Sequence, residues 1–403
     1  MISRPLYIDV ITPFIDKQQI KIITGIRRSG KSVVLRLLKE QLLQKGVEEE
    51  QIILLNFESF ACIELTKAQK LYEHIKERVK SPRKYYLLLD EIQEVEDWEK
   101  VVNSFLADFS VDMYITGSNS HLLSSELATY LAGRYVEIPV FTLSYREFLD
   151  FRKHYLKGEN TDNPFIHYLR FGGFPVIHTA NYPEEAAYKV VYDIYSSVIL
   201  RDTVQRYKIR DIELLERVIK YTFDSIGNTF SGKNVADYFK SQQRKVDVNT
   251  VYNYLNALEG AFILYRVPRY DIKGKEILKT QEKFYVSDVS IIYALMGYRD
   301  RMIAGILENI VFLELKRRGY SVYVGKLDSA EIDFVAEKRN EKIYVQVAYK
   351  LENEQTVSRE FGNLLAIDDQ HPKYVVTMDD FWKDNVEGVK HLYITDFLLS
   401  DVI

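Results

Sequence analysis

The residues with the clearest chemical meaning form the run Gly25-Ile-Arg-Arg-Ser-Gly-Lys31-Ser32. It has the spacing G-x-x-x-x-G-K-S, between an apolar, strand-like segment at 20–23 and an amphipathic, helix-like segment at 33–38. Such a loop turns backbone N–H groups toward phosphate oxygens at the N-terminus of a helix. Lys31 can reach the β- and γ-phosphates, and the Ser32 hydroxyl can ligate Mg²⁺. We therefore predict a nucleoside triphosphate site formed by Gly25, Ile26, Arg27, Arg28, Ser29, Gly30, Lys31, Ser32 and Val33.

Two adjacent carboxylates end the run Tyr85-Tyr-Leu-Leu-Leu-Asp90-Glu91. Five large apolar or aromatic residues before such a pair are typical of a buried parallel strand whose carboxyl edge opens into a site. Asp90 is expected to hold Mg²⁺, and Glu91 to orient and polarise the attacking water. An adjacent pair favours hydrolysis over nucleotide storage.

Composition limits the remaining possibilities. A chain of 403 residues is long enough for two to four domains, and its single cysteine excludes an internal disulfide and a cysteine zinc site. The first residues lack the apolar core of a signal peptide, and no uncharged stretch approaches the ~20 residues of a membrane span. We therefore expect a cytoplasmic protein without a membrane role. The net charge of −4 does not favour nucleic-acid binding by the chain as a whole, so such binding must be argued from individual segments.

Short apolar segments alternate with helical ones from 20 to about 145, which predicts an α/β fold with a parallel sheet. We expect strands at 21–24, 51–57, 85–90, 113–116 and 135–140. The strand before Gly117-Ser118-Asn119 ends in small polar residues, which are either near the γ-phosphate and the lytic water or a simple turn. Residues 148–211 are mostly helical in pattern and predict a lid over the nucleotide, with a bend at Gly172-Gly-Phe-Pro175.

The order of these motifs resembles a known family. After the phosphate loop come Asp90-Glu-Ile-Gln, Thr116-Gly-Ser, and Ala132-Gly-Arg134 ahead of Phe141-Thr-Leu-Ser-Tyr-Arg-Glu-Phe148. The set resembles the AAA+-type P-loop ATPases of bacteria and archaea that carry a C-terminal nuclease-like domain. Two later segments, Tyr168–Pro175 and Ile199-Leu-Arg-Asp202, resemble the same family, so the likeness covers nearly the whole chain.

The resemblance implies ATP with Mg²⁺ as the ligands and assigns further roles. By it, Ser118 or Asn119 is the sensor of the γ-phosphate, and Arg134 is a lid arginine or one supplied to a neighbour's site. An arginine supplied in trans would make hydrolysis depend on self-assembly. The alternative is that Arg134 pairs with a surface carboxylate.

Residues 212–280 predict a winged helix-turn-helix: three helices, the second capped by Ser231 and the third by Asn249, then a strand and a basic hairpin. Between 212 and 279, eleven Lys and Arg oppose eight Asp and Glu. The candidate DNA contacts are Arg244, Lys245, Arg269, Lys273 and Lys275 for phosphates and Tyr252, Asn253 and Asn256 for base edges. The alternative is that the module docks a protein.

Residues 281–403 predict a second α/β unit that resembles the PD-(D/E)xK nuclease fold, with Glu308 on a helix and Asp333 on a strand. In that fold a Glu two residues before a Lys completes the metal site, and here Gln346 and Ala348 stand at those positions. A neutral amide is a poor metal ligand, and Ala cannot polarise water. We therefore interpret Glu308, Asp333 and Gln346 as a vestigial nuclease site, with Lys350 and Lys316 as candidates for a displaced lysine.

The predicted organisation is an ATPase core at 1–147, a helical lid at 148–211, a winged helix-turn-helix at 212–280 and a degenerate PD-(D/E)xK domain at 281–403. The predicted function is Mg²⁺-dependent ATP binding and hydrolysis that controls how the winged helix and the nuclease-like domain contact DNA. Two alternatives remain open: a P-loop switch that acts on a protein partner without DNA, and an ATP-gated nuclease.

Overall fold

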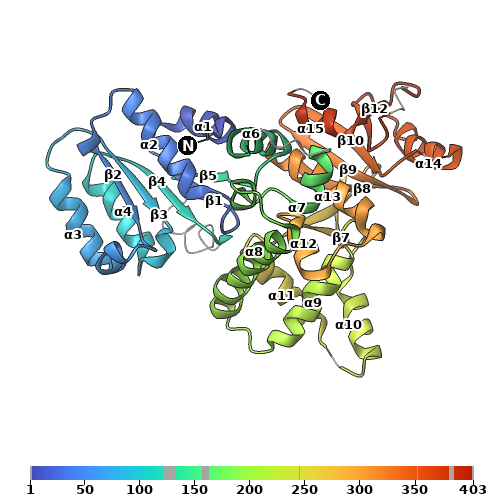
Figure 1. Cartoon of the computed structure of the whole chain (residues 1–403), viewed down its shortest axis with the longest axis horizontal. Helices are drawn as coiled ribbons and strands as arrows, with labels where there is room; N and C mark the ends of the chain where they lie inside the picture. The colour runs from blue at the N-terminus through green and yellow to red at the C-terminus, as the bar shows by residue number, and fades with distance from the viewer. Residues whose placement is uncertain are drawn as a thin grey trace. The chain divides into compact units, whose positions relative to one another are not determined.

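The structure, a computed structural model, describes residues 2–120, 133–156, 163–244, 246–351, 353–380 and 385–401. They belong to two compact units (Figure 1). The first unit comprises Met1–Val140 with Gly260–Phe262, and the second comprises Phe141–Glu259 with Ile263–Ile403. The first unit therefore ends at Val140 rather than at the predicted position 147.

The first unit is a parallel sheet covered by helices on both faces. Its strand order is β2-β3-β4-β1-β5, and all neighbours are parallel. The strands are β1 (Ile20–Thr24), β2 (Ile52–Asn56), β3 (Tyr85–Asp90), β4 (Val111–Gly117) and β5 (Tyr135–Pro139). Each of the five predicted strands is confirmed to within two residues of its ends. The alternation of short apolar runs with helical segments specified them locally, without any knowledge of the sheet order.

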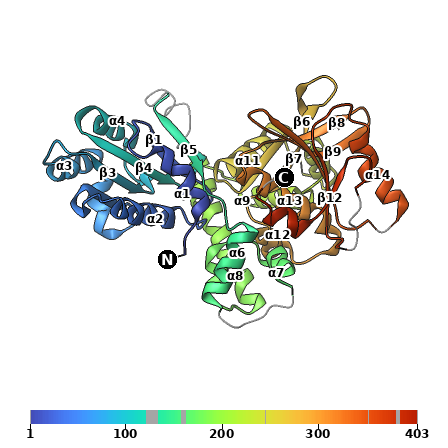
Figure 2. The ribbon, with the colours of Figure 1, turned by 90° about the horizontal axis from the view of Figure 1, so that it is seen from above.

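Helices lie on both faces of this sheet (Figures 1 and 2), and two apolar clusters hold them there. Buried residues such as Tyr7, Leu35 and Leu38 join helices α1 and α2 to one face of the sheet. Residues such as Leu71 and Phe105 join α3 and α4 to the other face. The helices are α1 (Pro5–Ile11), α2 (Lys31–Gln44), α3 (Ala68–Arg78) and α4 (Trp98–Asp108). Strand β3 is buried along its whole length, which explains its unbroken apolar sequence.

The second unit begins with helices. The described residues of the range 148–211 are mostly helical, as predicted, and include a π-helical segment at Val198–Gln205. The helices are α6 (Tyr145–Tyr155), α7 (Pro164–Phe171), α8 (Glu184–Ser197), α9 (Ile212–Asp224), α10 (Gly232–Ser241), α11 (Val248–Gly260), α12 (Ser290–Met296), α13 (Ile303–Arg317), α14 (Glu354–Leu365) and α15 (Ile394–Leu399).

A mixed sheet of seven strands forms the rest of this unit, in the order β12-β11-β10-β9-β8-β6-β7 (Figure 2). Because β6 pairs with β8 in parallel, the wing hairpin β6–β7 continues the C-terminal sheet. The predicted boundary at 280/281 is therefore wrong, since it cuts through β7. The strands are β6 (Leu264–Asp271), β7 (Glu276–Val286), β8 (Ser321–Leu327), β9 (Ala330–Lys338), β10 (Glu341–Ala348), β11 (Lys373–Thr377) and β12 (Lys390–Tyr393).

The caps of the winged-helix region differ in part from prediction. Ser231 is the N-cap residue of α10, but its side chain makes no capping hydrogen bond. Asn249 does not cap α11, because the helix already begins at Val248. The Asp247 side chain accepts the Asn249 N–H at 2.7 Å instead. A carboxylate at that position satisfies a free N–H group of the first turn and complements the helix dipole.

The predicted bend at Gly172-Gly173 follows the end of α7. Gly172 has φ 62°, and a Cβ there would lie 1.8 Å from Asp288 Oδ1. The other oxygen of this buried carboxylate accepts the Gly173 N–H at 2.8 Å. Only a residue without a side chain allows Asp288 to approach the backbone this closely, which explains the first glycine of the pair.

Candidate nucleotide site

The phosphate loop connects β1 to α2 and depends on two glycines with positive φ. Gly25 has φ 139°, and a Cβ on it would lie 2.1 Å from the backbone oxygen of Val140. Gly30 has φ 102° and is the N-cap residue of α2. The first N–H groups of α2 lack partners within the helix and are therefore available to phosphate oxygens. The backbone fits a phosphate cradle of the predicted kind.

The ammonium group of Lys31 lies inside this loop. Its Nζ donates to the backbone oxygens of Gly25 at 3.0 Å and Ile26 at 3.2 Å, and it lies 3.6 Å from Glu91 Oε1. The Lys31 side chain is buried at the N-terminus of α2. A buried ammonium held by weak backbone acceptors is well placed to pair with a phosphate, which is a stronger partner.

Asp90 is at the carboxyl end of β3, beside β4. Its Oδ1 accepts a hydrogen bond from Thr116 Oγ1 at 2.6 Å, and the Ser32 hydroxyl also hydrogen-bonds to this carboxylate. Burial raises the pKa of Asp90, outweighing these hydrogen bonds. A hydroxyl and a carboxylate in contact are the hard oxygen ligands that Mg²⁺ prefers. The predicted metal pair, Ser32 and Asp90, is therefore brought together.

Glu91 follows directly and has a left-handed backbone, with φ 57°. This uncommon conformation for a residue with a side chain lets its N–H donate to Thr116 Oγ1 at 2.9 Å. Burial acts to raise the pKa of Glu91, but Lys31, Gln93 and Arg27 together lower it. Glu91 is therefore ionised at neutral pH, as a group that polarises water must be. Backbone strain of this kind is found where function requires an exact side-chain position.

The polar tip of β4 lies at the same edge of the sheet. Ser118 and Asn119 are both buried just beyond this strand, and the Ser118 hydroxyl has no hydrogen-bond partner within the described part of the chain. Because β3 and β4 are parallel neighbours, their carboxyl ends meet. The structure thus brings Lys31, Ser32, Asp90, Glu91 and the Ser118–Asn119 pair into one site.

Arg134 lies elsewhere. Its backbone oxygen accepts the N–H of Ile20, the first residue of β1, at 2.8 Å, and its Nη1 donates to Asn103 at 3.3 Å. It lines a cavity of about 730 Å³ with Asn103, Lys17 and Phe109. The phosphate loop follows the opposite end of β1, roughly 16 Å away at ~3.3 Å per strand residue. A role for Arg134 in its own site, as a lid arginine, is therefore wrong.

Arg4 is a contact of the loop that the sequence did not reveal. Its guanidinium is 1% exposed, donates to the backbone oxygen of Ser29 at 2.7 Å, and lies 4.5 Å from the centre of the Tyr7 ring. No motif marks this residue, since it stands 25 positions before Ser29. It braces the loop from the side of α1.

Replacing Arg4 with Ala is expected to weaken ATP binding by about 10-fold, because the loop loses a charge-assisted hydrogen bond. Isothermal titration with ATP measures the change. Arg36→Ala, at an exposed position of α2, is the matched control and should bind as the unchanged protein does. Equal affinity of the Arg4 and Arg36 variants would contradict a bracing role.

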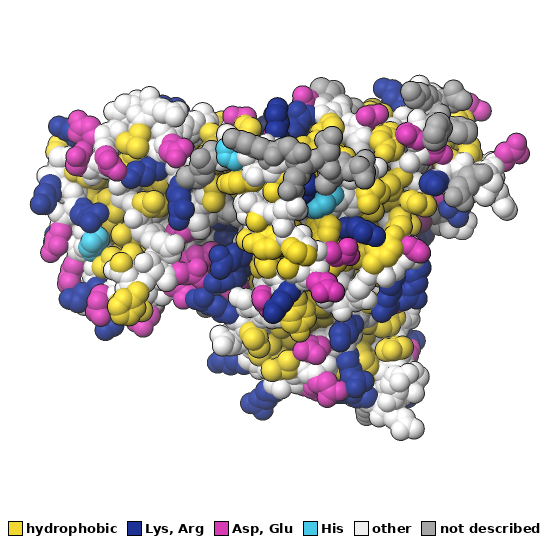
Figure 3. Space-filling view, viewed as in Figure 1, with side chains coloured by type: hydrophobic (Ala, Val, Ile, Leu, Met, Phe, Trp, Pro, Cys, Tyr) yellow, Lys and Arg dark blue, Asp and Glu magenta, His cyan; other side chains and the backbone are white. Residues whose placement is uncertain are grey.

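Three of the predicted phosphate contacts form ion pairs or lie close to carboxylates within the second unit. Arg244 pairs with Asp211 at 2.7 Å and Glu213 at 3.3 Å, and Lys273 pairs with Asp328 at 2.5 Å. Arg269 lies 4.0 Å from Glu331. Figure 3 shows cationic and anionic side chains interspersed over the face in view. These pairs neutralise much of the positive charge that the sequence count suggested.

The predicted base-reading residues also differ in their surroundings. The Tyr252 hydroxyl accepts the Gly232 N–H at 3.4 Å, with the Arg266 guanidinium 5.5 Å from its ring centre. Asn256 accepts from Arg266 at 2.7 Å. Asn253 and Lys275 are exposed, and Lys245 lies outside the described residues. Tyr252 therefore helps to pack α11 against α10, whereas Asn256 is exposed on α11 with Arg266 of β6 as its partner.

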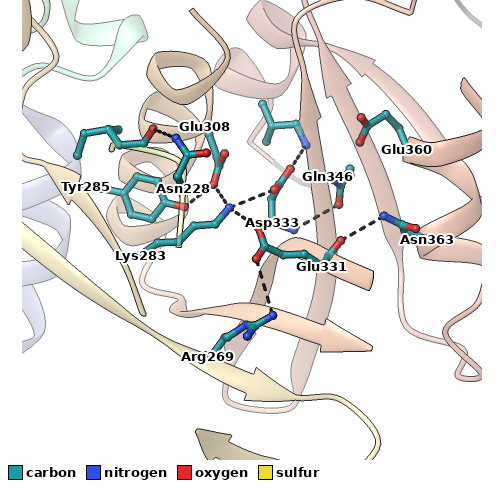
Figure 4. A network of polar contacts seen from close by, with 12 residues as sticks. Asn228, Arg269, Lys283, Tyr285, Glu308, Glu331, Asp333, Gln346, Glu360 and Asn363 are labelled. Atoms are coloured by element: carbon teal, nitrogen blue, oxygen red, sulfur yellow. Dashed lines mark hydrogen bonds and ion pairs between the residues drawn. The ribbon is translucent and has the colours of Figure 1, made fainter. Parts of the chain in front are cut away.

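The three residues that the sequence analysis assigned to a vestigial nuclease site do come together. Glu308 on α13, Asp333 on β9 and Gln346 on β10 are all buried, and the Gln346 oxygen accepts the Asp333 N–H at 3.3 Å (Figure 4). Burial raises the pKa of Asp333 to about 8, with the Glu308 charge adding to the effect. The lysine beside them is Lys283 of β7, which the sequence did not indicate, whereas Lys350 is exposed beyond β10.

The first unit is thus an AAA domain: a model described as "AAA domain" matches residues 17–149, and a "Domain of unknown function (DUF8612)" matches residues 163–301. A Haemophilus influenzae protein is 40% identical over 401 residues, covering 99% of both chains. The protein MJ1544 of Methanocaldococcus jannaschii is 30% identical over 413 residues, covering 97% of this chain and 89% of its own. The chain carries an AAA domain and belongs to the same family as these two relatives.

Two solved structures are distant matches. Cdc6p from Pyrobaculum aerophilum matches at a TM-score of 0.31 and 13% identity, over 77% of this chain and 93% of its own. AMPPCP-bound DnaA from Aquifex aeolicus matches at a TM-score of 0.31 and 14% identity, over 62% and 86%. TM-scores and identities this low carry no argument about this chain. Within the ranges that the structure describes, no helix has the length and apolarity of a membrane span.

Proposed function

We propose that the chain is a Mg²⁺-dependent ATPase whose nucleotide state controls the second unit. The observation that supports this most directly is the convergence of Lys31, Asp90, Glu91 and Thr116 beside the phosphate loop. Lys31 and Glu91 lie 3.6 Å apart, and Thr116 hydrogen-bonds to both Asp90 and the Glu91 backbone. Phosphoryl transfer needs a cation that pairs with the phosphates and carboxylates that hold the metal and orient the water, and this site contains both.

The residues fit the two ligands. Gly25 and Gly30 allow the tight loop to pass close to Val140 and Arg4, which a side chain at either position would prevent, and Lys31 is available to the β- and γ-phosphates. Ser32 and Asp90 would hold Mg²⁺, which when bound neutralises charge on the phosphate oxygens. Glu91 would accept a hydrogen bond from the attacking water, which orients the water oxygen toward the γ-phosphorus. Ser118 or Asn119 senses the γ-phosphate from the tip of β4.

In this proposal Arg134 acts in the nucleotide site of a neighbouring subunit. The side chain lies at the edge of the sheet opposite its own phosphate loop, so only another copy can bring it to a γ-phosphate. The ATPase would then work at full rate only in an assembled state, which links turnover to self-association.

A protein is a better candidate than DNA for the partner that the second unit binds. Arg244 and Lys273 already have acidic partners, and a surface without excess positive charge gives little of the electrostatic attraction on which nonspecific DNA binding depends. DNA is the second candidate, supported by the three-helix and wing order of α9–α11 and β6–β7 and by the exposed Asn253 and Lys275.

The test is ATP turnover at low salt with and without single-stranded, duplex and branched DNA. We expect the same rate with each, because Arg269 and Lys273 of the wing already have acidic partners. The Glu91→Gln variant gives the background. Stimulation that disappears with added salt, with Glu91→Gln and with Lys275→Ala would instead favour DNA as the partner.

A further inference from the structure

Strand β7 places the ammonium group of Lys283 at the centre of the vestigial nuclease site (Figure 4). Its Nζ lies 2.8 Å from Glu308 Oε1, 2.8 Å from Glu331 Oε1 and 3.5 Å from Asp333 Oδ1. The Lys283 side chain is 1% exposed. Three carboxylates from α13 and β9 therefore converge on one buried positive charge.

A divalent cation bound by the same carboxylates would have to lie against this ammonium or in its place. Mg²⁺ and Ca²⁺ contact carboxylate oxygens at about 2.0–2.6 Å, so the oxygens that bind the metal must point at a single centre. Here that centre is Nζ. A second cation beside it would be repelled at short range in a buried environment, where charge interactions are screened least.

The other polar atoms of the site are also engaged. The Tyr285 hydroxyl donates to Glu308 Oε1, and the Val347 N–H donates to Asp333 Oδ2 at 2.8 Å. The Gln346 oxygen accepts the Asp333 N–H. Within the part of the chain that the structure describes, no group of three or more His, Cys, Asp or Glu is arranged to hold a metal ion. The residues therefore do not fit the metal that the nuclease-like fold implies.

We infer that Lys283 is the resident cation of this site and that its ammonium takes the place of a divalent metal. The cluster joins the wing strand β7 to helix α13 and strand β9, so an ancestral metal position serves as an internal ion-pair centre. Gln346 and Ala348 agree with this reading, because a site without a metal needs neither a carboxylate nor a lysine at those positions.

Mn²⁺ binding to the full-length, nucleotide-free protein tests the inference, with free Mn²⁺ measured by electron paramagnetic resonance. The unchanged protein and Asp333→Asn should give the same titration, since any weak binding at Ser32 and Asp90 is common to both. Lys283→Met should gain a Mn²⁺ site, and adding Asp333→Asn to that variant should weaken the new site by at least ~10-fold. Lys283→Arg, which keeps the charge, should gain none.

A Mn²⁺ site in the unchanged protein that is lost in Asp333→Asn would overturn the inference. So would a folded Lys283→Met variant that gains no site. Lys283→Met leaves three carboxylates without their cation, and a variant that is isolated unfolded is a second informative outcome. In that case folding on addition of Mn²⁺ supports the inference, and failure to fold with Mn²⁺ present contradicts it.

Discussion

Replacing Glu91 with Gln is expected to lower the ATP turnover number by about 100- to 10,000-fold while leaving ATP binding intact. The amide has the same shape, so the left-handed turn after β3 and the contact of its N–H with Thr116 remain. What is lost is the negative charge that polarises water beside Lys31. Phosphate release and ATP titration, measured on the same preparation, separate the two effects.

The control is Glu50→Gln, an exposed carboxylate in the short turn Glu49–Gln51 before β2. It should turn over ATP at the unchanged rate. Lys31→Ala is expected to differ from Glu91→Gln by losing ATP affinity as well, because Lys31 pairs with the phosphates in the ground state. A Glu91→Gln variant with near-normal turnover would show that another group orients the water.

Replacing Arg134 with Ala is expected to reduce turnover by about 1,000-fold or more, the usual range for an arginine that stabilises the transition-state charge. Because this arginine lies at the far edge of its own sheet, the loss must arise in a neighbouring site. Mixing Arg134→Ala with Lys31→Ala should therefore restore activity, since one supplies an intact phosphate loop and the other an intact arginine. Turnover of the unchanged protein should also rise with protein concentration.

Arg83→Ala is the matched control, since Arg83 is exposed and pairs only on the surface, with Glu48 at 2.6 Å. Sedimentation of each variant with ATP shows whether assembly itself is preserved. If the two inactive variants assemble together yet restore nothing, Arg134 does not act in trans. Its hydrogen bond to Asn103 would then be its whole role.

The opposite placement of Arg134 and Lys31 follows from the direction of the strands. In a parallel sheet every strand ends at the same edge, so residues after a strand meet residues after its neighbours. Glu91 and Ser118 both follow their strands and both reach the site. Arg134 precedes β5 and therefore lies at the opposite edge.

The winged-helix region shows why a charge count is a weak guide to a binding surface. The excess of Lys and Arg over Asp and Glu from 212 to 279 is real, but two of these cations pair with Asp328 of the β8–β9 turn and Glu331 of β9. Those carboxylates reach the wing only because β6 pairs with β8. Charges that belong to one segment of the sequence are thus neutralised by residues of another.

The sequence by itself determined the parts that depend on near neighbours. The phosphate loop, its two glycines, the strand before Asp90 and the five strands of the first unit are all specified by patterns a few residues long, because backbone conformation and side-chain periodicity are local properties. The assignment of Ser32, Asp90 and Glu91 to one site followed from the same motifs.

Only the tertiary structure decided which distant residues became partners. Arg4 against Ser29, the continuation of the wing into the C-terminal sheet, and Lys283 among Glu308, Glu331 and Asp333 each join segments far apart in the sequence. Such contacts depend on strand order, register and burial. These are set by packing of the whole unit, and a buried ammonium is stable only where carboxylates from other elements compensate its charge.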